Sequence, residues 1–143
     1  MGSLAIRSQP PDKESYNDPS KGGSGGIIHF NPKDGYAWEQ NGVGGELRVN
    51  RVNIRLGHEL FHGLDANRGY LSYDKAEGGY AKAEWQGVYR ENLMRSQMNL
   101  PLRTRYGNVT GIDSDRGTVQ YIPSGPLMLN IDGTPIKPTW KFE

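Results

Sequence analysis

The sequence predicts a compact α+β domain in which two helices face each other beside a small antiparallel sheet. Apolar residues recur at helical spacing over residues 52–68, and a second stretch with helical spacing runs from about residue 81 to 98. Short β-branched and aromatic runs on both sides alternate with turns rich in glycine and proline, which is typical of strands. A length of 143 residues fits one domain with one core.

The composition excludes several classes of protein. With 34% hydrophobic residues and 20 glycines, the core should be small and the loops many. The chain has no cysteine, so disulfides and thiolate ligands are excluded. A net charge of +1 favours neither nucleic acid nor a membrane surface as a partner. No apolar run approaches the ~20 residues that span a bilayer and no signal peptide is visible, so we expect a soluble protein.

The first 26 residues have a different composition from the rest. They are rich in proline, serine, glycine and charge, and such a mixture buries too little apolar area to offset its ordering entropy. We therefore expect a flexible tail or linker over residues 1–26 and a folded domain over residues 27–143. The tail is either a tether to another unit or an ordinary mobile N-terminus.

Three short strands are predicted before the first helix. They cover residues 27–30, 36–39 and 46–50, which are separated by turns rich in glycine, proline and asparagine. His29 lies in the first of them, where a lone histidine in an apolar strand is more often a core group than a metal ligand.

The first predicted helix carries the pattern HExxH, formed by His58, Glu59 and His62. Residues four apart lie on one helical face, so both imidazoles can reach a single metal ion, with Glu59 beside them. A zinc peptidase needs two neutral nitrogen ligands and a carboxylate that accepts a proton from the metal-bound water. The alternative is a surface helix with two incidental histidines. Two of only three histidines in the chain have this spacing, which favours the metal.

The residues around this pattern predict how the helix is bounded and packed. Asn50 or Asn53 is expected to cap its start, and Gly69 is expected to end it in the left-handed conformation. Five apolar residues fall opposite the histidines and are expected to face the core. They are Val52, Leu56, Leu60, Phe61 and Leu64.

The second predicted helix places four side chains on one stripe, namely Glu84, Val88, Glu91 and Arg95. Either glutamate is the right kind of group to complete a site of two histidines and one glutamate, with water in the fourth position. A surface ion pair between Glu91 and Arg95 is the alternative, and spacing alone does not separate the two interpretations.

The remaining residues, 107–143, are predicted to form strands and turns. Residues 119–123 and 127–131 are expected to be strands, and Asp132 with Gly133 forms a turn typical of hairpins. Prolines in and beside these runs predict edge strands. This region is expected to shape a substrate groove or to contact a partner.

The segments GHELFH, AEWQGVYRENLMR and PLRTRY resemble bacterial effector metallopeptidases of the NleD type, whose relatives include toxin domains of Rhs-type proteins. The resemblance runs from about residue 26 to 106. The matching positions outside HExxH are Glu84, Glu91, Asn92, Arg95, Arg103 and Tyr106. The chain departs from the family at Gly-Leu-Asp after His62, which leaves open whether Asp65 accepts a hydrogen bond from an imidazole N–H.

The resemblance implies a zincin-like fold with one Zn²⁺ held by His58, His62 and Glu84. Glu91 is then the alternative ligand or, as we expect, a group behind the ligands, braced by Arg95 or Arg103. Arg103 and Tyr106 are similar to the arginine and tyrosine of clostridial neurotoxin light chains. A cation or a phenol aimed at the developing oxyanion stabilises the transition state by roughly 3–4 kcal/mol per donor. Solvated charge and simple packing are the respective alternatives for these two residues.

The expected function is that of a zinc endopeptidase in which Glu59 activates water. The resemblance implies a secreted effector or toxin domain that is delivered into a target cell and cleaves a protein there. It also implies a secretion apparatus, a carrier domain or a cognate immunity protein as partners. Alternatives are a catalytically silent binding module, a hydrolase of cell-wall peptides and a deamidase-like metal enzyme. The presence of Glu59 argues against a silent module, because such a module does not need a base.

Overall fold

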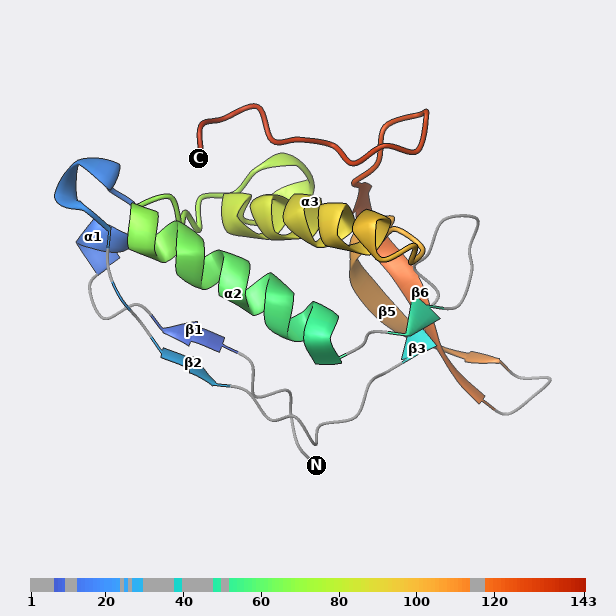
Figure 1. Cartoon of the computed structure of the whole chain (residues 1–143). Coiled ribbons are helices and arrows are strands. Elements are labelled where there is room, and N and C mark those ends of the chain that lie inside the picture. The colour runs from blue at the N-terminus through green and yellow to red at the C-terminus, as the bar shows by residue number, and fades with distance from the viewer. Residues whose placement is uncertain are drawn as a thin grey trace.

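Two consecutive helices, α2 (Val52–Arg68) and α3 (Lys82–Gln97), form the centre of the fold and lie side by side (Figure 1). The structure is a computed structural model. It describes residues 7–9, 13–23, 25, 27–29, 38–39, 48–49, 52–113 and 118–143. The architecture is α+β, with two packed helices and a small antiparallel sheet, which confirms the predicted fold class at that level.

The hairpin of β5 (Arg105–Asp113) and β6 (Thr118–Leu127) lies beside α3 (Figure 1). Its antiparallel register pairs Arg105 with Leu127 and Asp113 with Thr118, and an irregularity falls between Arg105 and Gly107. The strand predicted at residues 119–123 lies within β6. The strand predicted at 127–131 is wrong, because β6 ends at Leu127 and only an isolated bridge from Leu129 to Pro135 follows.

The other described elements are short. They are β1 (Arg7–Gln9), α1 (Lys13–Tyr16), η1 (Pro19–Lys21), β2 (Ile27–His29), β3 (Trp38–Glu39), β4 (Arg48–Val49) and η3 (Glu77–Gly79). β1 pairs with β2 and β3 with β4, both antiparallel. Each of the three strands predicted before α2 contains a described strand, namely β2, β3 and β4. The remaining residues of those predicted strands, Asn50 among them, lie outside the described part of the chain.

Part of the expected N-terminal tail is packed structure. Tyr16 is only 9% exposed and belongs to an apolar cluster with Ala66, Leu71 and Ala83. The backbone carbonyl of Tyr16 accepts a hydrogen bond from the N–H of Leu71 at 2.9 Å. Tyr16, which lies within the expected tail, thus packs against the two helices and the segment that joins them. Burial of the Tyr16 ring stabilises this packing, although the residues around Tyr16 in the sequence are mostly polar.

The buried face of α2 is the histidine face, which contradicts the predicted core face. The buried residues of this helix are Ile54, His58, His62, Asp65 and Ala66. Of the residues predicted to face the core, Leu60 is 50% exposed, and Leu56, Phe61 and Leu64 are only partly buried. The side chain of Val52 lies outside the described set. The reason is that α3 presents polar partners to α2, so the polar side chains satisfy one another between the helices.

The C-terminal end of the chain runs over α3 (Figure 1), and its polar contacts with α3 continue from there to α2. The indole N–H of Trp140 donates to the amide oxygen of Gln86 at 2.8 Å, and the amide nitrogen of Gln86 donates to Asp65 at 2.8 Å. Arg90 pairs with the second oxygen of Asp65 and lies 4.9 Å from the centre of the Phe142 ring. Because its groups are paired, this network favours a single arrangement of the two helices.

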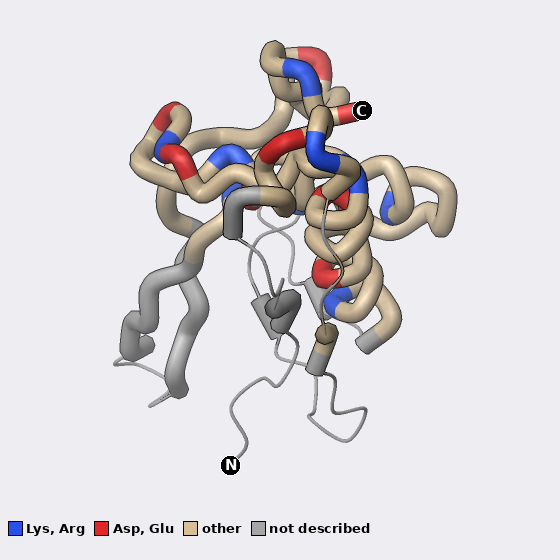
Figure 2. The backbone as a smooth tube through the Cα atoms, turned by 90° about the vertical axis from the view of Figure 1, so that its left-hand side faces the viewer, with Lys and Arg blue, Asp and Glu red and all other residues tan. Residues whose placement is uncertain are grey.

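Basic and acidic positions are interspersed along the described backbone rather than separated by sign (Figure 2). Within the described part of the chain, no helix combines the length and the apolar character that a membrane crossing requires.

Candidate metal centre

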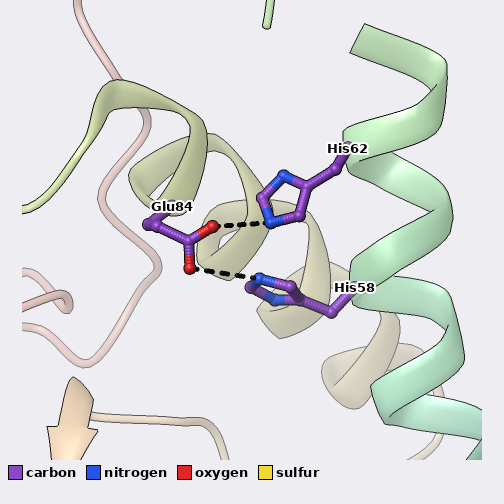
Figure 3. A group of neighbouring side chains, drawn as sticks. All are labelled: His58, His62 and Glu84. Carbon is purple, nitrogen blue, oxygen red and sulfur yellow. Dashed lines mark ion pairs between the residues drawn. The ribbon is translucent and has the colours of Figure 1, made fainter. Parts of the chain in front are cut away.

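α2 and α3 bring two histidines and one glutamate together between them. His58 and His62 are 7% and 5% exposed, and their rings meet edge to face with centroids 4.7 Å apart. Glu84 lies in the first turn of α3, and its carboxylate points at both rings (Figure 3). Its oxygens lie 2.6 Å from Nε2 of His62 and 3.8 Å from Nε2 of His58.

This group fits a metal ion by its chemistry and its geometry. One donor atom from each of the three residues lies within 4.8 Å of the others. Two imidazole nitrogens and one carboxylate oxygen form a donor set that metal sites use, and an open position would remain for water. Both histidines are buried, and Glu84 is partly buried. The described residues could therefore hold a metal ion at this place.

Glu91 lies behind His58 and fixes the orientation of its ring. Nδ1 of His58 is 3.1 Å from Oε1 of Glu91, which is 1% exposed. Nε of Arg95 donates to Glu91 at 2.8 Å, and Nη1 of Arg103 donates to it at the same distance. An ionised carboxylate only accepts hydrogen bonds, so Nδ1 of His58 carries a proton, and Nε2 on the other side of the ring faces Glu84. The structure thus separates the two glutamates that spacing left equivalent.

Asp65 does not accept a hydrogen bond from an imidazole, although the sequence left that role open. Its oxygens accept from Gln86 and Arg90 instead. Nδ1 of His62 is buried and has no hydrogen-bond partner among the described residues. Asp65 therefore acts on the site through the packing of α2 against α3.

The two carboxylates on either side of His58 make this place favourable for positive charge. Burial alone would lower the pKa of His58, but hydrogen bonds with Glu84 and Glu91 outweigh it and raise the pKa to about 9. Burial alone would raise the pKa of Glu84, yet its hydrogen bonds with His58 and His62 hold that pKa well below the usual range. Burial likewise opposes ionisation of Glu91, and the cation of Arg103 holds its pKa low. Both glutamates are thus ionised.

Glu59 and Tyr106 lie beside this group, and different neighbouring charges act on their pKa values. Burial raises the pKa of the Glu59 carboxyl group, and the nearby His62 and His58 partly offset the effect. Within the described part of the chain, no side chain forms an ion pair or a hydrogen bond with Glu59. Burial and the carboxylate of Glu84 raise the pKa of Tyr106, so its phenol stays protonated and can donate. Its ring centre lies 6.4 Å from that of His58.

The guanidinium of Arg103 contacts Glu91 and lies 5.0 Å from the centre of the Tyr106 ring. Besides Glu91, its guanidinium donates to the backbone carbonyls of Arg105 and Tyr106. Asn92 holds the backbone of Arg103 from both sides, accepting from its N–H at 2.7 Å and donating to its carbonyl at 3.0 Å. The contact with Glu91 places the guanidinium on the Nδ1 side of His58. These contacts support a role for Arg103 in holding Glu91.

Sequence reasoning missed Gly87, which faces both histidines from the middle of α3. A glycine inside a helix costs roughly 1 kcal/mol relative to alanine, which is a signal that some other requirement holds the residue there. It also missed the contacts of Asp65 with Gln86 and Arg90, because nothing local to those residues shows that they meet.

Comparisons of the chain with protein-family models, with curated proteins and with solved structures find no match. A function is therefore inferred from the side chains of the site.

Proposed function

We propose that the chain is a zinc-dependent endopeptidase of the HExxH-plus-glutamate type, with a zincin-like fold. The observation that carries this proposal is the buried group of His58, His62 and Glu84 with the carboxylate of Glu59 beside it. Two nitrogen donors and one oxygen donor favour Zn²⁺ over the hard cations, which prefer oxygen alone. When bound, zinc would lower the pKa of water and polarise a peptide carbonyl group.

Glu59 is the residue that we assign as the general base. A base works best when its pKa lies near the working pH, and burial moves the pKa of Glu59 upward from that of an ordinary glutamate. The oxygen of water adds to the peptide carbonyl carbon while Glu59 accepts a proton from that water. Glu59 then gives the proton to the leaving nitrogen, the C–N bond breaks, and a carboxylic acid and an amine result.

Tyr106 is the residue that we assign to the developing oxyanion. Its protonated phenol can donate a hydrogen bond to the carbonyl oxygen of the substrate as negative charge develops there. Arg103 is bound to Glu91 and to two backbone carbonyls, so we give it a positioning role. Glu91 and Arg103 together keep the Nε2 atom of His58 available as a donor.

The biological setting of the proposal rests on the resemblance of the motifs to effector and toxin peptidases. We propose delivery into a target cell, a protein substrate in that cell, and a secretion apparatus, carrier domain or cognate immunity protein as partners. A binding module has no use for the base that Glu59 supplies or for the protonated phenol of Tyr106, which favours the enzyme over a silent relative.

Zinc content and cleavage test the proposal together. Protein purified without added metal should contain about one zinc per chain by elemental analysis. In a lysate of candidate target cells, mass spectrometry should find new protein N-termini that a chelator abolishes and added zinc restores. His58→Ala/His62→Ala serves as the control that should lack both the metal and the cleavage. A folded, metal-free protein that still cleaves would overturn the proposal.

Glu91→Gln is expected to weaken zinc binding while leaving the ligands in place. The amide keeps the shape of the side chain but loses the charge that pairs with Arg95 and Arg103, so the ring of His58 is held less firmly. We expect a loss of roughly 10- to 100-fold in zinc affinity, measured by competition with a chromophoric chelator. Glu77→Gln is the matched control, because the Glu77 side chain is exposed. An affinity equal to that of the control would contradict the role of Glu91.

A further inference from the structure

Gly87 is the point at which the two histidine rings rest on the backbone of α3. A Cβ atom built on this buried glycine would lie 2.8 Å from Cε1 and 2.9 Å from Nε2 of His58. It would also lie 3.1 Å from Cε1 of His62. Contacts below 3.0 Å between a Cβ and another heavy atom force something to shift, so a side chain at position 87 cannot coexist with this placement of the rings.

The conflict at Gly87 differs from the conflicts at the two glycines of α2. A Cβ at Gly57 would meet the Cε atom of Met94 at 2.6 Å, and a Cβ at Gly63 would meet Cδ1 of Ile28 at 3.1 Å. Those atoms end flexible side chains that can turn aside. The atoms that face Gly87 belong to buried imidazole rings, and the ring of His58 is anchored through Nδ1 to Glu91.

The backbone at Gly87 does not itself require glycine. Gly87 is not among the glycines with positive φ, and it lies inside α3, where alanine is the better helix former. What the position requires is the absence of a side chain. The atoms that need this space are Cε1 and Nε2 of His58 and Cε1 of His62, and in both rings the Nε2 atom faces Glu84.

We propose that Gly87 is a positioning residue of the metal centre. By leaving room over α3, it lets both imidazoles approach the carboxylate of Glu84 closely enough to act as one donor set. A methyl group at this position would press the two rings back toward α2 and away from Glu84. The inference rests on the proposed function only in taking the three donors to hold zinc.

Zinc affinity of Gly87→Ala, with Gly57→Ala and Gly63→Ala as matched controls, tests the proposal. We expect Gly87→Ala to lose roughly 10- to 100-fold in zinc affinity by chelator competition, whereas the controls bind like the wild type. The visible spectrum of Co²⁺ bound to Gly87→Ala should also differ from that of the wild type, because it reports the geometry of the donors. A folded Gly87→Ala with the affinity and spectrum of the wild type overturns the inference. Failure of the wild type itself to bind zinc overturns the proposed function instead.

A second comparison keeps the test decisive if Gly87→Ala does not fold. The same alanine is placed in the His58→Ala/His62→Ala background, where no ring remains for the methyl group to meet. Thermal unfolding of the metal-free proteins should show that the alanine is harmful with the histidines present and harmless without them. An equal loss of stability in both backgrounds would mean that Gly87 serves the packing of α3 alone, which overturns the inference.

Discussion

Glu59→Gln is expected to lower kcat for peptide hydrolysis by a factor of about 10² to 10⁴ while zinc remains bound. The amide has nearly the size and shape of the carboxylate, so α2 and the positions of His58 and His62 should be kept. What disappears is the group that accepts the proton of the attacking water. Because Glu59 makes no ion pair or hydrogen bond with another described side chain, its charge supports little of the surrounding structure. The loss should therefore fall on kcat rather than on stability.

The measurement for this variant is the steady-state rate on a peptide that contains a cleavage site identified in the lysate experiment. Zinc content and the thermal unfolding midpoint are recorded on the same sample. Glu77→Gln makes the same chemical change at an exposed glutamate and should keep the activity of the wild type. If Glu59→Gln keeps zinc and also keeps full activity, the base lies elsewhere and the assignment of Glu59 is wrong.

Glu84→Gln is expected to cost more zinc affinity than the roughly 10- to 100-fold typical of changes behind the ligands. The substitution replaces an ionised oxygen donor with a neutral amide at the point where both histidine rings converge. It also removes a negative charge from beside Nε2 of His58 and His62, where a metal cation would be placed. Activity should be lost together with the metal, unlike in Glu59→Gln.

Zinc retention after dialysis against a weak chelator distinguishes the two glutamates of α3. Glu84→Gln should lose the metal, whereas Glu91→Gln should retain much of it under the same conditions. The opposite order would make Glu91 the ligand and Glu84 the supporting group. Both substitutions remove one charge from the same face of the same helix, so each is a control for the other.

Both helices and the cluster of motifs could be predicted from the sequence because their signals are local. The spacing of His58 and His62 and the stripe on α3 follow from helical geometry alone. The core face of α2 could not be predicted in the same way. Apolar periodicity favours Leu60 and its neighbours, but the buried side is set by Gln86, Arg90 and the other polar partners that α3 supplies from further along the chain.

The roles of Glu84 and Glu91 also depend on how α2 packs against α3, so the sequence alone does not separate them. They lie two turns apart on one stripe, so only the position of α2 decides which carboxylate meets the Nε2 atoms and which meets Nδ1 of His58. Arg103 was expected beside an oxyanion, but its guanidinium lies where Asn92 and the start of β5 direct it. Composition also gives no sign that Tyr16 packs against Ala66, Leu71 and Ala83, because it averages over that one residue.

The positions of the donors along the chain have a consequence for the order of folding. His58, His62 and Glu84 come from consecutive helices joined by residues 69–81, whereas the hydrogen bond of Trp140 to Gln86 spans 54 residues. Closing a short loop costs less chain entropy than closing a long one, and contacts near in sequence form sooner. We therefore expect the three donors to come together before the C-terminal end of the chain packs. That end would then pack on two helices that are already in contact.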